Sequence, residues 1–160
     1  MAILNIIDKN DPTIRKISKP VDKITPRILT LLDDMKQTLR DVGGIGLAAV
    51  QVGVLRRVVI IDIGDAENSS IIELINPEII ASSGEQQEAE GCLSCKGQYA
   101  ITKRPMEVTL QALDRDGVLQ TYKGTDLLAR AFCHETDHLD GILFLDNAVR
   151  ELSPDELEND

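Results

Sequence analysis

The residues best suited to catalysis lie in one segment, His134-Glu135-Thr136-Asp137-His138, which has the pattern H-E-x-x-H inside an apolar run. Side chains four residues apart lie on one face of a helix, about 5–6 Å apart at Cβ, so both imidazoles can reach one metal ion. Glu135 follows the first histidine and can handle protons beside that metal. The chain has no other histidine in its 160 residues. A helix with one buried and one surface histidine would also fit, but the spacing favours metal-dependent catalysis.

A third metal ligand is expected, because two histidines leave a metal ion with too few donors. A thiolate from Cys92 would give a Cys-His-His site with an open fourth position, as a catalytic metal needs. The alternative is a closed structural zinc site made of Cys92, Cys95, His134 and His138. Cys95 precedes His134 by 39 positions, whereas compact zinc fingers have about 12–15, and a structural site has no use for Glu135. A redox C-x-x-C pair, the third interpretation, lacks its usual βαβ context.

The segment 44–51 (GIGLAAVQ) adds a polar side chain among small residues. Glycine and alanine let another molecule approach the backbone closely. In that setting Gln51 could donate its amide N–H to a developing oxyanion. A helix stop followed by tight packing explains the same residues, and the segment alone favours that simpler interpretation. It does not follow the G-x-G-x-x-G pattern of nucleotide-binding loops.

Length and composition predict one globular domain over residues 1–160, since 42% of the residues are hydrophobic. The net charge is −10, from 17 basic and 27 acidic residues. Residues 151–160 hold five acids and no base, so the rest of the chain is at 17 against 22, or −5. We predict that 151–160 form a flexible acidic tail. General nucleic-acid binding is not expected, because it requires a basic surface.

The sequence predicts a cytoplasmic protein without membrane contact. It has no run of 18 apolar residues, and the N-terminus lacks the basic and apolar regions of an export signal. Three cysteines, an odd number, argue against a disulfide framework and indicate reduced thiols.

Two amphipathic helices are predicted, over residues 26–41 and 126–139. Thr25-Pro26 and Thr125 are typical of helix starts, and Gly43-Gly44 and Gly141 of helix ends. A short helical turn is expected at 11–17, where Asp11 precedes Pro12.

Strands are predicted at 57–63 and 71–75, and a hairpin at 107–113 and 118–123 around the turn 114–117. Helices and strands do not alternate regularly. The fold class is therefore predicted as α+β, with mainly antiparallel β-sheets around a central helix that carries the H-E-x-x-H motif.

Three segments together resemble one family, peptide deformylase. Residues 44–51 are similar to its G-x-G-x-A-A-x-Q motif, 90–94 to its E-G-C-L-S motif, and 134–138 to its H-E-x-D-H motif. Residues 11–15 and 112–117 are also similar, and the resemblance covers about residues 4–147. Three motifs in the same order and separation are a specific signal.

The resemblance implies hydrolysis of the formyl group from the N-terminal formyl-methionine of newly made polypeptides, with release of formate. It implies one Fe²⁺ per chain, which Zn²⁺, Ni²⁺ or Co²⁺ can replace. The implied partners are N-formylmethionyl nascent peptides and the ribosome near its exit tunnel.

The resemblance also implies a role for each motif residue. The implied metal ligands are Cys92, His134 and His138. A metal-bound hydroxide attacks the formyl carbon, and Glu135 is the general acid/base. The oxyanion is held by Gln51 and the backbone N–H of Leu93. The backbone of Ile45 and Gly46 holds the substrate main chain, beside a hydrophobic pocket for the methionine side chain.

The chain departs from the family pattern directly after Ser94. The family usually continues with an apolar residue and proline, whereas this chain has Cys95-Lys96. The change removes the proline that stiffens the loop and places a second thiol three residues from Cys92. Two alternatives stay open on the sequence: a metallopeptidase with H-E-x-x-H chemistry, and a non-catalytic zinc module.

Overall fold

The computed structural model describes residues 2–64 and 71–158. The helices are η1 (Pro12–Arg15), α1 (Pro26–Val42), η2 (Ala49–Val52), α2 (Asp126–Leu139), η3 (Phe144–Asn147) and α3 (Pro154–Glu158), where η denotes a 3₁₀ helix. The strands are β1 (Gly46–Ala48), β2 (Val58–Asp62), β3 (Ile71–Ser83), β4 (Gln86–Gly91), β5 (Tyr99–Arg104), β6 (Glu107–Leu113), β7 (Leu119–Thr125) and β8 (Ala148–Glu151).

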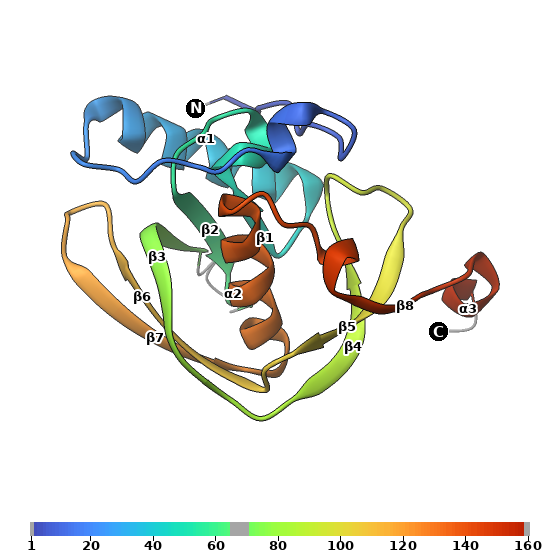
Figure 1. Cartoon of the computed structure of the whole chain (residues 1–160). Coiled ribbons are helices and arrows are strands. Elements are labelled where there is room, and N and C mark those ends of the chain that lie inside the picture. The colour runs from blue at the N-terminus through green and yellow to red at the C-terminus, as the bar shows by residue number, and fades with distance from the viewer. Residues whose placement is uncertain (1, 65–70, 159–160) are drawn as a thin grey trace.

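Helix α2 lies at the centre of the molecule, with a β-sheet on either side (Figure 1). One sheet has five strands in the order β1-β2-β3-β6-β7, and the other has three in the order β4-β5-β8. Neighbouring strands are antiparallel throughout both sheets. The predicted α+β fold with a central motif-bearing helix is confirmed.

Strand β2 is covered on both faces, which explains its uninterrupted apolar sequence. Val59 and Ile61 face the core around α2, whereas Val58 and Ile60 face the core beneath α1. All four side chains are fully buried. This two-sided burial fixes β2 and its neighbour β1, and β1 leads directly into the site.

Both predicted helices form almost within the predicted bounds. Helix α1 begins with Pro26 and ends at Val42, and the next residue, Gly43, has a φ of 72°, which is left-handed and suits glycine. Thr25 and Thr125 precede the helices as expected, but neither makes a side-chain capping hydrogen bond. At η1, by contrast, the Asp11 carboxylate accepts a hydrogen bond from the Thr13 N–H.

The sequence analysis missed β1, β4, β5 and β8 and predicted β3 too short. β3 continues through Asn76 and Pro77 to Ser83, with register shifts against β6 between Ile75 and Glu78. Proline has no N–H for a ladder and is tolerated at such bulges. The strand predicted to end at residue 75 therefore continues past a bulge at Asn76-Pro77.

The first residues of the predicted tail, 151–160, belong to a strand and a short helix. Glu151 pairs with Ala100 in the small sheet, and Arg150 forms an ion pair of 2.6 Å with Glu156 of α3. Residues 159–160 lie outside the described residues. The flexibility of the tail stays a prediction. No helix within 2–64 or 71–158 is long and apolar enough to cross a membrane.

Candidate metal centre and active site

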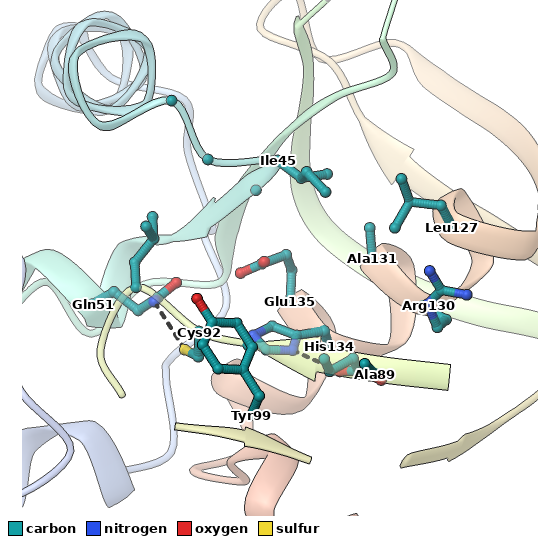
Figure 2. A pocket seen from close by; sticks show the side chains of 16 residues that line it. Ile45, Gln51, Ala89, Cys92, Tyr99, Leu127, Arg130, Ala131, His134 and Glu135 are labelled. Atoms are coloured by element: carbon teal, nitrogen blue, oxygen red, sulfur yellow. Dashed lines mark hydrogen bonds and ion pairs between the residues drawn. The ribbon is translucent and has the colours of Figure 1, made fainter. Parts of the chain in front are cut away.

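A pocket of about 380 Å³ opens beside the N-terminal half of α2. It is lined by seven residues that the sequence singled out, Ile45, Gly46, Gln51, Cys92, Leu93, His134 and Glu135. Figure 2 shows that the labelled side chains among them come from α2 (His134 and Glu135), from η2 (Gln51), from the residue before β1 (Ile45) and from the segment after β4 (Cys92). Residues that are about 40 to 90 positions apart in the sequence thus share one cavity.

The same pocket is also lined by residues to which the sequence analysis gave no role in catalysis or binding. They are Gly43, Gly44, Ala89, Glu90, Gly91, Tyr99, Leu127, Arg130 and Ala131. Leu127 and Ala131 precede His134 on α2, and Ile45 lies across the pocket from them (Figure 2). Ile45 and Leu127 are 44% and 49% exposed, which leaves apolar surface free to contact a ligand.

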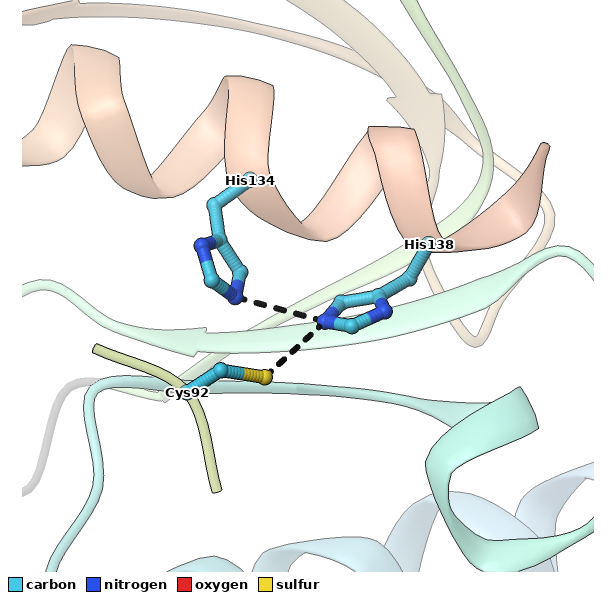
Figure 3. A group of neighbouring side chains, drawn as sticks. All are labelled: Cys92, His134 and His138. Carbon is cyan, nitrogen blue, oxygen red and sulfur yellow. Dashed lines mark hydrogen bonds between the residues drawn. The ribbon is translucent and has the colours of Figure 1, made fainter. Parts of the chain in front are cut away.

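Three side chains of metal-binding type converge beside this pocket: Cys92 and His134 line it, whereas His138 is fully buried and is not among its lining residues. Nε2 of His134 lies 3.3 Å from Nε2 of His138, and Sγ of Cys92 lies 3.4 Å from Nε2 of His138 (Figure 3). All three donor atoms lie within 4.8 Å of one another. Donors bound to one tetrahedral ion at about 2.0–2.3 Å are about 3.3–3.6 Å apart, so this spacing fits a metal ion.

The protonation of His138 also suits a metal ligand. Its side chain is fully buried. Burial and the nearby His134 ring hold the pKa of His138 well below its usual value. The imidazole is therefore neutral at pH 7, which is the form that binds metals.

A buried carboxylate orients the other imidazole. Oε1 of Glu90 lies 2.9 Å from Nδ1 of His134. Arg104 on β5 donates to both carboxylate oxygens of Glu90, at 2.9 and 3.1 Å, and the Thr102 hydroxyl donates to one of them. Burial raises the pKa of Glu90, but hydrogen bonds from His134 and Arg104 outweigh it and lower the pKa to about 2. A charged Glu90 thus turns Nε2 of His134 towards the other donors.

Arg104 also ties this network to the end of α2. Its Nη1 donates to Asp137 at 2.7 Å, and Asn147 donates to the same oxygen at 3.3 Å. Glu90 and Asp137 lie inside motifs that the sequence displayed, but Arg104 lies in no motif. Only the pairing of β4 with β5 places it beside Glu90.

Glu135 is a buried carboxylate next to the three donors. Its side chain is 5% exposed, and within the described ranges its Oε1 has no hydrogen-bond partner. Burial raises its pKa to about 7, despite the opposing charge of His134. Gly46 of β1 lies against it, since a Cβ there would come within 2.7 Å of Glu135 Oε2. An unpaired carboxyl group that titrates near neutral pH can both accept and donate a proton.

Gln51 is held with its amide nitrogen towards Cys92. Its Oε1 accepts a hydrogen bond of 2.9 Å from the Ala48 N–H. Its Nε2 donates to Ser94 Oγ at 3.2 Å and to Cys92 Sγ at 3.6 Å. The small residues before Gln51 therefore fix a hydrogen-bond donor at the edge of the metal-binding group.

Cys95 is not one of the three converging donors. In the part of the chain that the structure describes, the side chains close enough to share an ion there are Cys92, His134 and His138. Cys95 instead forms a side-chain hydrogen bond with Cys92. This bond lowers the pKa of Cys95 to about 7, although burial acts to raise it. The same bond, burial and the Glu135 charge raise the pKa of Cys92. The donor arrangement does not favour a closed four-ligand zinc site.

The fold and the site together define the class of this protein, a metal-dependent enzyme. An antiparallel α+β protein that brings a thiol, two imidazoles and an unpaired carboxylate to one site has the composition of a catalytic metal centre. A family profile described as polypeptide deformylase matches residues 3–153. The chain belongs to this family.

Similar proteins support the assignment over the whole chain. A peptide deformylase from Acetivibrio thermocellus is 52% identical over 158 residues, covering 99% of this chain and 91% of the relative. One from Caldanaerobacter subterraneus is 50% identical, covering 99% and 97%. The crystal structure of a Legionella pneumophila peptide deformylase has a TM-score of 0.87 at 43% identity, covering 99% and 90%. The Synechococcus elongatus enzyme in complex with actinonin has a TM-score of 0.86 at 35% identity, covering 98% and 84%.

The predicted family, fold class and enzyme activity are thereby confirmed. The chain is a hydrolase that removes the formyl group from newly made peptides. The family is metal-dependent, and the group of Cys92, His134 and His138 is suited to hold the ion.

Proposed function

We propose that this chain deformylates N-terminal formyl-methionine at the pocket beside α2, with Cys92, His134 and His138 as ligands of one metal ion. The observation that carries the proposal is the convergence of these three donors with the buried, unpaired carboxylate of Glu135. We further propose that residues 1–160 act as one catalytic domain, with 151–160 as a flexible tail.

The proposed metal is Fe²⁺, one per chain, with Zn²⁺, Ni²⁺ or Co²⁺ as possible replacements. One thiolate and two imidazoles form a donor set that suits iron and zinc alike. When bound, such an ion polarises the formyl carbonyl and lowers the pKa of a bound water towards about 7. The iron assignment rests on the family resemblance, since these donors do not distinguish the two metals.

Glu135 moves the proton in the proposed reaction. Its carboxylate accepts a proton from the water that attacks the formyl carbon, and the protonated group then delivers it to the departing amine nitrogen. A pKa raised to about 7 by burial suits both steps, because neither protonation state is strongly disfavoured at neutral pH. Formate and the free amino terminus of methionine are the products.

Gln51 and Leu93 stabilise the oxygen on which negative charge develops. The amide nitrogen of Gln51 is fixed beside Cys92, and Leu93 follows Cys92 directly. Two donors at this edge of the pocket form an oxyanion hole, in which fixed hydrogen-bond donors lower the barrier for attack on a carbonyl.

The substrate main chain binds along β1. This strand is at the edge of the five-stranded sheet, and among the described strands it pairs with β2 alone. The Ile45 carbonyl accepts a hydrogen bond from the Asp62 N–H at 2.7 Å, so the backbone of the next residue, Gly46, faces the open edge. The Ile45 carbonyl, predicted to hold the substrate main chain, is thus already bonded to Asp62, so we propose that Gly46 binds the peptide through its backbone and that Ile45 contacts the methionine side chain.

The proposed cellular setting follows from the substrate. Formylated chains emerge where polypeptides are made, so we propose that the protein acts in the cytoplasm near the ribosomal exit tunnel. Co-sedimentation with translating ribosomes, compared with ribosomes stripped of nascent chains, tests this partner. Equal amounts of protein in both pellets would argue against capture through nascent chains.

The proposed division of roles is tested with Glu135→Ala. Formate release should fall by about 10²–10⁴-fold, as expected when a general acid/base is removed. The metal content per chain should stay at the wild-type value, because Glu135 is not one of the three converging donors. Loss of the metal from this variant would contradict the role assigned to Glu135.

A further inference from the structure

Cys95 lies at the end of a tight turn that begins at Cys92. The Cys95 N–H donates to the Cys92 carbonyl at 3.0 Å, with Leu93 and Ser94 between them. The end residues of such a turn have Cα atoms less than about 7 Å apart, and disulfides span about 4.4–6.8 Å between Cα atoms. The backbone thus already holds the two cysteines at a separation that a disulfide can bridge.

Cys92 is partly exposed and within reach of small molecules, whereas Cys95 is buried, at 1% exposure, and forms a side-chain hydrogen bond with Cys92. A groove of about 820 Å³ is lined by Cys92 and Cys95, together with residues 3–6 of the N-terminal segment. Cys92 lines the active-site pocket as well. The third thiol, Cys133, is buried on α2 and is not among the described residues that line either cavity.

We propose that Cys95 is a resolving thiol that converts oxidised Cys92 into a reversible disulfide. The deformylation reaction gives Cys95 no role, and the family pattern has no thiol at this position. Its position on the turn next to Cys92 is what such a role requires.

The reaction with a hydroperoxide, ROOH, balances in two steps. The Cys92 sulfur attacks the terminal peroxide oxygen, the O–O bond breaks, and the thiol proton of Cys92 passes to the departing alkoxide, so the products are a sulfenic acid and ROH. Cys95 then attacks the Cys92 sulfur, an S–S bond forms, and the hydroxyl leaves as water with the Cys95 proton. Overall, two thiols are oxidised by two electrons and one hydroperoxide is reduced. A dithiol reductant then reduces the disulfide and restores both thiols.

The disulfide has two consequences for the site. It removes the thiolate from the donor group and leaves His134 and His138, which hold a metal ion weakly. It also prevents further oxidation of Cys92 to a sulfinic acid, which is irreversible in most proteins. The loss of metal rests on the proposed function of Cys92 as a ligand, whereas formation of the disulfide does not.

The test uses zinc-loaded protein, because ferrous iron and peroxide generate radicals. Wild type, Cys95→Ser, Cys95→Ala and the matched control Cys133→Ser are treated with hydrogen peroxide, alkylated, and analysed by mass spectrometry before and after dithiothreitol. Wild type and Cys133→Ser should contain a Cys92–Cys95 disulfide that dithiothreitol removes. Both Cys95 variants should instead gain oxygen atoms at Cys92 that persist after reduction.

Two results would overturn the proposal. One is wild-type protein that gains oxygen atoms at Cys92 without forming the disulfide. The other is full recovery of Cys92 in both Cys95 variants. Two different substitutions of Cys95 are compared, and circular dichroism spectra of both variants show whether either of them is misfolded. Because the readout is a mass, failure of this proposal is distinct from failure of the deformylase assignment, which would appear as missing formate release from reduced protein.

Discussion

Nδ1 of His134 lies 2.9 Å from Oε1 of Glu90, and the same carboxylate is bound by Arg104 on the neighbouring strand. This contact joins the central helix to the small sheet. It also leaves Nε2 as the ring nitrogen that faces Cys92 and His138. The geometry of the donor group therefore depends on residues that themselves bind no ion.

Glu90→Gln should weaken metal binding. The amide keeps the shape of the side chain but loses the negative charge that stabilises the His134 ring and Arg104. Replacing an outer partner of a metal-binding histidine typically lowers metal affinity by about 10–100-fold. Titration with Co²⁺ against a competing chelator measures this effect. Glu88→Gln, at an exposed position on the same strand, is the matched control and should bind metal as wild type does.

Gln51→Leu should slow turnover without removing the metal. The substitution removes the Nε2 donor and leaves the Ala48 N–H without its partner. Loss of one oxyanion donor typically costs about 10²–10³-fold in kcat. Steady-state formate release and metal analysis separate turnover from metal content. Gln87→Leu, on an exposed part of β4, is the control. A Gln51→Leu variant with wild-type kcat would exclude Gln51 from the oxyanion hole.

Gly46→Ala should impair activity through Glu135. The added Cβ would lie 2.7 Å from Glu135 Oε2 and 2.9 Å from its Cγ, closer than such contacts allow. The carboxylate must move, and we expect kcat to fall by at least about tenfold because proton transfer depends on its position. Metal content should not change. A crystal structure of the variant with Glu135 in its original place would refute this explanation.

The stability of the protein should depend on pH through Glu73. Glu73 accepts hydrogen bonds from Arg115 at 2.8 and 2.5 Å and forms an ion pair with Lys36 at 3.1 Å. Burial raises the pKa of Glu73, but these cations outweigh it and lower the pKa below its ordinary value of 4.5. A lowered pKa contributes stability that is complete above the unfolded-state value and is lost as the pH falls through the folded-state value.

Glu73→Gln should therefore destabilise the protein at pH 7 by about 1.5–3 kcal/mol, the range for a hydrogen bond to a charged group. Below the ordinary pKa of 4.5, wild type and variant should converge. Urea unfolding at a series of pH values measures the difference in the free energy of unfolding. Glu78→Gln, at an exposed position on the same strand, is the control. A difference that stays constant down to pH 3 would show that Glu73 is not stabilised by its charge.

The sequence predicts the fold best where its pattern is periodic. The apolar spacing in 26–41 and 126–139 reproduces α1 and α2 to within one residue at either end. The strand at 57–63 and the hairpin at 107–123 are also present. β4 and β5 escape detection because several of their residues are charged or polar, so neither segment has a strand's apolar alternation.

The candidate site was predictable only as separate motifs. The motifs supplied Gln51, Cys92 and the two histidines; the structure brings Gln51, Cys92 and His134 to one pocket and groups His138 with Cys92 and His134. The distances among them, and the place of Arg104 behind Glu90, depend on strand pairing that no local pattern encodes. Tyr99, Leu127 and Arg130 likewise line the pocket through the arrangement of β5 and α2 rather than through a motif.

The central claim is tested most directly by formate release from a formyl-Met tripeptide, with iron-loaded protein prepared without oxygen. The account predicts metal-dependent release of one formate per substrate, and no cleavage of the unformylated tripeptide. Apoprotein should be inactive until Fe²⁺ is added. Cleavage of the unformylated peptide would instead indicate a metallopeptidase. Absence of formate from protein with a full complement of metal would contradict the proposed function of this site.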